Sequence, residues 1–223
     1  MPRDRASGIA HAFLPPGRWF VRRDYYYART KLRTDPLYPS VCDALRGTCA
    51  PLLDIGCGLG LLVHALRADG QAMPYHGYDN DASKVERARE AAERRALADV
   101  EFGVADLGGQ LPVHRGSVAL LDVMQFIPAP AQVRAIDALL GMLEPGAKLV
   151  VRTGVADGSR RARITRAVDV FAKKVGWMNS LPVHYPELEM LRARFDAAGV
   201  EGDFIPLHGN TPFNNWRIVA TKR

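Results

Sequence analysis

A glycine-rich loop early in the chain has residue types that suit the binding of a small ligand. It reads Leu53-Asp54-Ile55-Gly56-Cys57-Gly58-Leu59-Gly60 and joins a predicted strand to a predicted helix. Glycines let the backbone turn tightly and let a ligand approach the main chain, and the helix start offers N–H groups without intrahelical partners. The residues expected to line this site are Asp54, Gly56, Cys57, Gly58 and Gly60.

The spacing of these glycines separates two classes of nucleotide cofactor. Dinucleotide enzymes use G-x-G-x-x-G and place a pyrophosphate at the helix N-terminus. Counted from Gly56 and Gly58, their third glycine would fall where this chain has Leu61, and the glycine stands at Gly60 instead. The G-x-G-x-G pattern after the acid Asp54 resembles the first motif of class I S-adenosylmethionine-dependent methyltransferases. An NAD-dependent oxidoreductase is therefore the weakest alternative.

Further acids follow the next two predicted strands. Asp79 and the adjacent Asn80 stand where a carboxylate accepts hydrogen bonds from ribose hydroxyls, a feature that NAD enzymes share. The run Asp79-Asn80-Asp81 can also cap the following helix, so we expect both roles, with Asp81 nearer the cap. After the third strand, the resemblance implies that Asp106 contacts the adenine amine and that the backbone near Leu107 assists. A solvated loop aspartate is the alternative interpretation of Asp106.

The resemblance extends past the fourth predicted strand. The segment Leu121–Pro128 resembles the D-x-x-[HQ]-like run that closes the cofactor site. It implies that Gln125 faces the methionine portion or the sulfonium, and that Asp122 is structural. Altogether the resemblance covers residues 50–153. It implies S-adenosylmethionine as donor and S-adenosylhomocysteine as product, with Asp54 near the ammonium of the methionine end.

The elements that must position these residues follow an alternating pattern. Short apolar runs alternate with helical patterns from about Ala50 onward, which is typical of a parallel sheet with crossover helices. Strands are expected at 51–55, 75–78, 100–104, 117–123, 147–152, 204–207 and 216–220, and helices at 59–68, 82–95, 131–143, 159–175 and 186–198. The predicted fold is α/β, a doubly wound, mostly parallel seven-stranded sheet with an antiparallel C-terminal strand pair and a helical N-terminal arm. We expect an arm or lid over 1–49 and a Rossmann-like domain over 50–223, with a helical insert at about 154–198.

Composition narrows the class of protein without naming its partner. The 223 residues are 48% hydrophobic and 24% charged, which suits one globular domain, and no apolar run is long enough to span a membrane. Three cysteines without C-x-x-C spacing argue against a zinc site or a disulfide framework. We therefore expect no bound metal, and we expect a cytoplasmic location. Cys57 could be a nucleophile, but a small residue chosen for packing is favoured.

The methyl acceptor is less defined than the cofactor. A general base is needed only if the acceptor must lose a proton, and the candidate bases are His184 and His208, with structural or solvated histidines as the alternative. In this fold the acceptor pocket is usually built by the N-terminal segment, the insert and the last hairpin. Aromatic walls there suit a small hydrophobic or aromatic acceptor, although ordinary packing is the favoured interpretation for any one of these residues. The candidates are Tyr25, Tyr26, Trp177, Tyr185, Phe213, Asn214 and Asn215.

A basic amphipathic helix is predicted over 159–175. It could be a solvated face, dock on an anionic membrane surface, or dock on an acidic carrier protein that delivers the acceptor. The net charge of +6 also permits RNA binding. No DNA partner is expected, because the [N/D]-P-P-[F/Y/W] motif of DNA-base amino methyltransferases is missing after the fourth strand, where the chain reads Asp122-Val123-Met124-Gln125. The predicted function is methylation of a small, aromatic or lipid-linked acceptor in bacterial biosynthesis. The alternatives are an RNA or protein methyltransferase and a non-catalytic S-adenosylmethionine-binding subunit.

Overall fold

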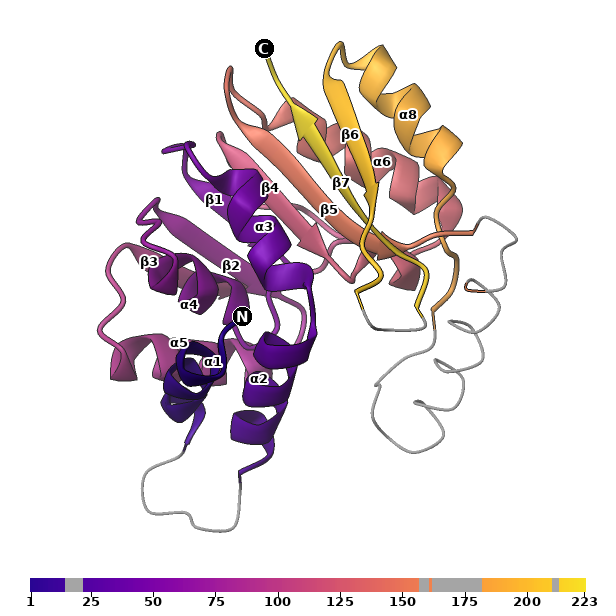
Figure 1. Cartoon of the computed structure of the whole chain (residues 1–223). Helices are drawn as coiled ribbons and strands as arrows, with labels where there is room; N and C mark the ends of the chain where they lie inside the picture. The colour runs from indigo at the N-terminus through magenta and orange to yellow at the C-terminus, as the bar shows by residue number, and fades with distance from the viewer. Residues whose placement is uncertain (15–21, 157–160, 162–181, 210–212) are drawn as a thin grey trace.

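A twisted sheet forms the centre of the computed structural model, which describes residues 1–14, 22–156, 161, 182–209 and 213–223 (Figure 1). Its strands are β1 (Leu52–Ile55), β2 (Tyr75–Asp79), β3 (Val100–Val104), β4 (Ser117–Leu121), β5 (Lys148–Gly154), β6 (Glu201–Pro206) and β7 (Asn215–Thr221). The order is β3-β2-β1-β4-β5-β7-β6, with β1 to β5 parallel and β7 antiparallel to both β5 and β6. This confirms the predicted doubly wound sheet with an antiparallel C-terminal pair.

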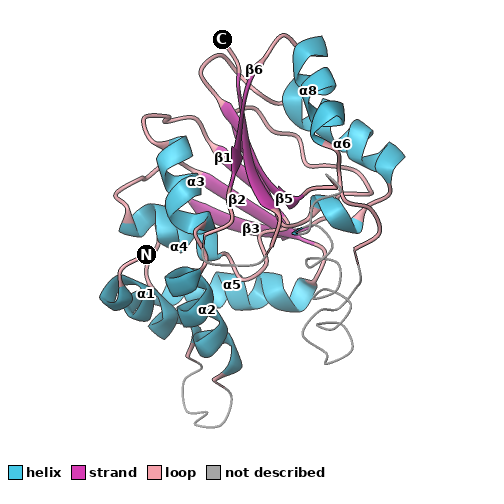
Figure 2. Ribbon diagram, turned by 45° about the vertical axis from the view of Figure 1, so that its right-hand side comes forward, coloured by secondary structure: helices cyan, strands magenta, loops and turns pink. Residues whose placement is uncertain are grey.

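Helices cover both faces of the sheet (Figure 2). They are α1 (Arg3–Ala10), η1 (His11–Phe13), α2 (Arg23–Thr34), α3 (Leu37–Leu45), α4 (Leu61–Ala68), α5 (Ala82–Arg94), η2 (Met124–Phe126), α6 (Ala129–Gly141) and α8 (Leu188–Ala197). Successive residues of a strand point to opposite faces of the sheet. Ala119 and Val150 belong to the core beneath α3 and α4, whereas Leu120 and Val151 belong to the core beneath α6 and α8. Burial on both faces explains why β4 and the first half of β5, Leu149 to Val151, are mainly apolar.

The N-terminal arm is helical, as predicted, and it shares a hydrophobic core with the sheet. Ile9 of α1, Leu32 of α2 and Val41 of α3 are at most 1% exposed and belong to the cluster that contains Val150. Their burial removes apolar surface from water, which is the main favourable contribution to docking the arm. The arm therefore packs against the sheet and is not detached from it.

Some element boundaries differ from the sequence-based expectation. The fourth strand ends at Leu121 and not at position 123, because Asp122 adopts a left-handed backbone with φ of 60°. The fifth strand continues to Gly154, where it still pairs with Asn215 of β7. The predicted basic helix over 159–175, the possible docking surface for a carrier or membrane, lies almost wholly outside the described residues, as does Trp177. None of the described helices has both the length and the apolar character needed to cross a bilayer.

Candidate cofactor site

The glycine loop turns through three left-handed residues between β1 and α4. The φ angles of Gly56, Gly58 and Gly60 are 76°, 56° and 71°, a region that other residues enter at a cost. A Cβ atom at Gly56 would lie 2.2 Å from Val123 Cγ2, and one at Gly60 would lie 2.7 Å from Phe102 Cζ. One at Gly58 would have no atom of the described residues within 4 Å. The first and third glycines thus permit close packing, and Gly58 leaves open space for a ligand.

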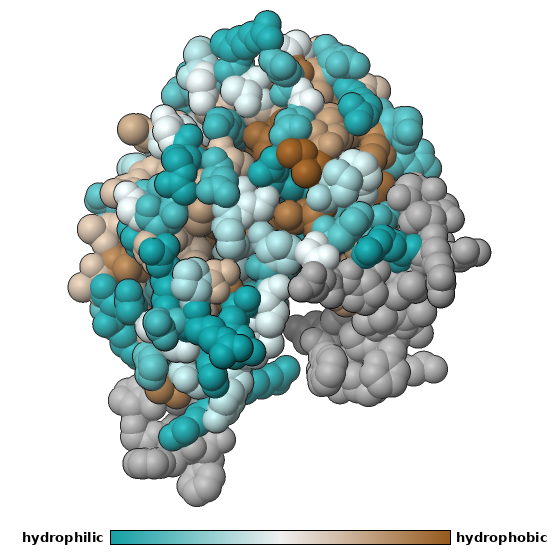
Figure 3. Space-filling model, in the orientation of Figure 1, coloured by the Kyte–Doolittle hydropathy of each residue, from teal (hydrophilic) through white to brown (hydrophobic). Residues whose placement is uncertain are grey.

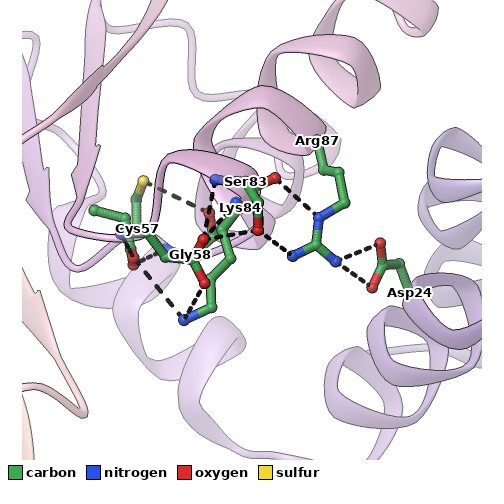
Figure 4. Close-up of polar contacts among 8 residues, drawn as sticks. Asp24, Cys57, Gly58, Ser83, Lys84 and Arg87 are labelled. Carbon is green, nitrogen blue, oxygen red and sulfur yellow. Dashed lines mark hydrogen bonds and ion pairs between the residues drawn. The ribbon is translucent and has the colours of Figure 1, made fainter. Parts of the chain in front are cut away.

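Asp79 holds this loop from the end of the neighbouring strand. Gly58 N donates a hydrogen bond of 2.9 Å to Asp79 Oδ2, and Asp81 N donates one of 3.0 Å to Asp79 Oδ1. Asp81 is the helix cap, as expected, because its Oδ1 accepts from the backbone N–H groups of Ser83 and Lys84. Figure 4 shows Gly58 close to these first residues of α5. A carboxylate at the loop is therefore present where the ribose contact is predicted.

Asp54 provides a buried carboxylate beneath the loop. Its side chain accepts a 2.5 Å hydrogen bond from the Tyr75 hydroxyl at Oδ2, while Oδ1 is buried without a hydrogen-bond partner among the described residues. The pKa of Asp54 is raised to about 7, mainly by burial; the hydrogen bond from Tyr75 opposes this shift and the charge of Asp79 adds to it. An unpaired buried carboxylate oxygen is a costly feature that a cation would relieve. The site therefore suits the ammonium group of a methionine tail.

We expect the affinity for S-adenosylhomocysteine to fall as pH decreases below about 7. The ligand ammonium pairs with ionised Asp54, so protonation of the carboxyl group competes with binding, approaching about tenfold per pH unit. The same raised pKa means that the ligand-free fold gains stability as pH falls, because the folded state binds a proton that the unfolded chain lacks. Calorimetric titration between pH 5.5 and 7.5 measures the affinity.

The matched control for this pH dependence is Asp54→Asn. Its amide cannot ionise, so its ligand affinity should be weaker at neutral pH and independent of pH over that interval. A wild-type affinity that is the same at both ends of the interval would contradict the role given to Asp54.

Gln125 lies at the carboxyl ends of β4 and β5. Its Nε2 donates to the Asp122 carbonyl at 3.1 Å, and its Oε1 accepts from Thr153 Oγ1 at 3.3 Å. Its own carbonyl accepts from the backbone N–H groups of Val183 and His184, at 2.8 and 3.2 Å. The structure therefore brings the candidate base His184 next to Gln125, although the two residues are far apart in the sequence.

Three acceptor candidates gather at the end of β5. A Cβ atom at Gly154 would lie 3.0 Å from Tyr185 Cε1 and 3.9 Å from Asn215 Oδ1, so both side chains pack against this glycine. Asn214 is buried, and its Nδ2 donates to the Val155 carbonyl at 3.0 Å. Tyr185, Asn214 and Asn215 thus form one polar and aromatic wall.

Other predicted residues lie elsewhere. Tyr25 and Tyr26 of α2 contact each other with ring centroids 5.2 Å apart, and Tyr25 also contacts the ring of His11. Tyr26 is 52% exposed, and a contact of either tyrosine with the acceptor stays a prediction. Asp106 is exposed, and its Oδ1 accepts from Gly108 N at 2.9 Å, so its adenine contact, like that of the partly buried Leu107, stays a prediction. His208 and Phe213 are partly buried in the last hairpin.

A charged network beside the site was not predicted from the sequence. Asp122, at the end of β4, forms ion pairs with Lys31 of α2 and Arg152 of β5, and Asp35 pairs with both cations. In the sequence, the one sign of this network was the acid Asp122 in the segment after the fourth strand. Its partners could not be predicted, because they are distant in the chain. The arm is thus connected electrostatically to the edge of the sheet that carries the cofactor loop.

A parallel sheet of this order, a G-x-G-x-G loop and acids at adjacent strand ends define a Rossmann-like S-adenosylmethionine-dependent methyltransferase. Residues 49–179 match the family model described as a methyltransferase domain, which is more than half of the chain, so the protein belongs to this family. S-adenosylmethionine is accordingly its cofactor. Among the described residues, the open space at Gly58 and the Asp54 oxygen without a hydrogen-bond partner agree with this assignment.

Known proteins similar to the chain include methyltransferases of small molecules. A ubiquinone biosynthesis O-methyltransferase of Xylella fastidiosa is 30% identical over 105 residues, which are 47% of this chain and 42% of the relative. The chain therefore matches less than half the length of this curated relative. The magnesium protoporphyrin IX methyltransferase of Synechocystis PCC 6803, solved with bound SAH, has a TM-score of 0.63 at 19% identity and covers 99% of this chain and 94% of its own. The structure of a mitomycin 7-O-methyltransferase has a TM-score of 0.65 at 22% identity, and the match covers 91% of this chain and 57% of the mitomycin enzyme. These two structures show that the fold is shared.

Proposed function

We propose that the protein transfers a methyl group from S-adenosylmethionine to a small aromatic or lipid-linked acceptor in bacterial biosynthesis. The observation that carries the proposal is the wall of Tyr185, Asn214 and Asn215 at the end of β5, the strand whose Thr153 bonds to Gln125. An aromatic surface with a few fixed amide groups suits a flat acceptor that carries hydroxyl groups. The ubiquinone biosynthesis relative supports the same acceptor class.

The chemistry requires positioning more than it requires reactive side chains. The cofactor supplies an activated methyl group, and the glycine loop with Asp79 fixes its location. The wall at β5 orients the acceptor oxygen toward the site and excludes water, which contributes much of the acceleration in bimolecular displacements. His184 is exposed, with its backbone bonded to Gln125, and it is our first candidate to accept the hydroxyl proton; His208 is the second.

The proposal is tested by measuring S-adenosylhomocysteine release with catechols or quinols, with and without an isoprenoid tail. We expect turnover with at least one of these acceptors. We also expect His184→Ala to lower kcat by about a hundredfold or more, with cofactor affinity unchanged, and His208→Ala to serve as the comparison. Turnover only with RNA or protein would replace the proposal by the macromolecular alternative. Binding of S-adenosylhomocysteine without turnover on any of these acceptors or on a cell extract would favour the non-catalytic subunit.

A cytoplasmic site of action belongs to the same proposal. All three cysteines lie in the described part of the chain and are free. Free thiols persist in a reducing compartment, where S-adenosylmethionine-dependent biosynthesis would take place.

A further inference from the structure

The ion-pair network between α2 and the sheet contains one cation whose side chain is partly exposed. Lys31 Nζ lies 3.3 Å from Asp122 Oδ2 and 3.7 Å from Asp35 Oδ2, and its side chain is 24% exposed. Arg152 pairs with the same two acids, and its side chain is only 6% exposed. Lys31 is thus held in place by two carboxylates, and its side chain is less buried than that of Arg152.

This cation is linked to the glycine loop through Asp122 and Val123. Its partner Asp122 is followed immediately by Val123, whose side chain fills the space next to Gly56. Asp122 has a positive φ, a conformation that costs energy for a residue with a side chain and persists only where the surroundings impose it. Lys31, Asp122, Val123 and Gly56 therefore form a continuous series of contacts from the arm to the loop.

The opposite end of α2 is also tied to an element of the site. Arg87 of α5 donates two hydrogen bonds of 2.9 Å to the carboxylate of Asp24 (Figure 4). Helix α2 therefore contacts α5 through Asp24, and it contacts Asp122, the residue after β4, through Lys31. Its solvent-facing surface is mostly hydrophilic (Figure 3), and the arm is fixed across this edge of the sheet at two points.

The cofactor carries a negatively charged group that a cation such as Lys31 could bind. The methionine tail carries both an ammonium and a carboxylate, and Asp54 accounts for the ammonium. The described cations that pair with acids at the ends of β2 and β4 are Lys84, Arg152 and Lys31. Lys84 pairs with Asp79 and Asp81, on the ribose side, and Arg152 is buried. Of these three cations, Lys31 is the one at Asp122 that is partly exposed, and its ammonium has three N–H donors, of which one remains after the two acids.

We propose that Lys31 of the N-terminal arm binds the carboxylate of the methionine tail, with Asp35 and Asp122 as positioning residues. The proposal rests on the cofactor assignment. It makes the arm a part of the cofactor site, so that occupancy of the loop by the tail would stabilise the docking of α2 over it.

The test compares two ligands that differ only at the tail. S-adenosylhomocysteine has the tail, whereas 5′-methylthioadenosine has the same nucleoside and sulfur without it. In calorimetric titrations we expect Lys31→Met to weaken S-adenosylhomocysteine binding roughly tenfold to hundredfold and to leave methylthioadenosine affinity unchanged. Lys31→Arg should restore most of the loss. The matched control is Arg33→Met, an exposed cation on the same helix that should change neither affinity.

Each outcome separates the inference from the function it rests on. An equal loss for both ligands would mean that Lys31 only stabilises the arm, and an unchanged S-adenosylhomocysteine affinity would exclude the contact; either result overturns the inference. A wild-type protein that binds neither ligand would instead overturn the cofactor assignment. Thermal unfolding of each variant without ligand shows whether the fold is retained. If Lys31→Met does not fold, Lys31→Gln, which keeps a hydrogen-bond donor toward the two acids but has no charge, is compared on the same two ligands with the same expected and contradicting results.

Discussion

Replacement of Asp79 by alanine is expected to reduce the affinity for S-adenosylhomocysteine by about a hundredfold or more. The carboxylate accepts hydrogen bonds from Gly58 N and Asp81 N, so its loss frees the centre of the loop as well as removing the predicted ribose contact. Hydrogen bonds to charged groups contribute about 1.5–3 kcal/mol each, and two or more such contacts depend on this side chain. Isothermal titration calorimetry measures the loss directly.

Asp81→Ala is the matched control for this prediction. Asp81 caps α5 through Ser83 N and Lys84 N, so its removal should lower the free energy of unfolding by about 1 kcal/mol. Its effect on ligand affinity should stay within a few-fold. If both variants lost affinity equally, Asp79 would act only through the helix start, and its role at the ribose would have to be abandoned.

The second large effect is expected at Gly56, and it concerns folding stability. An alanine there would keep a φ of 76° at a cost of about 1–2 kcal/mol. Its Cβ would also lie 2.2 Å from Val123 Cγ2, and such overpacking typically costs about 1–3 kcal/mol. We therefore expect Gly56→Ala to lower the free energy of unfolding by about 2–5 kcal/mol and to abolish cofactor binding. Urea denaturation followed by circular dichroism measures the stability.

Gly47→Ala separates the two contributions. Gly47 has a φ of 84°, but a Cβ atom there would have no atom of the described part of the chain within 4 Å, so only the backbone cost should be observed. Adding Val123→Ala to Gly56→Ala should relieve the clash and leave the backbone cost. A Gly56→Ala variant as stable as Gly47→Ala would show that the loop adjusts without strain, contrary to this packing argument.

Local patterns predicted the cofactor half of the protein. The glycine spacing and the acid of Asp54 depend on backbone geometry within a few residues, and alternating apolar runs reflect burial on one or both faces of each element. The predicted third strand agrees with β3 at both ends, and the second helix, expected over 82–95, is α5 over Ala82–Arg94. A predicted strand boundary was wrong where the backbone conformation of one residue ends the strand. Asp122 has a left-handed conformation, and β4 therefore ends before it.

Chain order by itself determined the class of the protein, because a βαβ sheet brings successive strand ends to one edge and so places Asp54 and Asp79 together. Only the tertiary structure decided which distant side chains complete that edge. Lys31 and Asp122 are 91 residues apart, and Arg152 and Asp35 are 117 residues apart, yet they form one charged network. No periodicity signals such contacts, since they arise from the docking of the arm on the sheet through buried apolar residues and from electrostatic pairing after that docking.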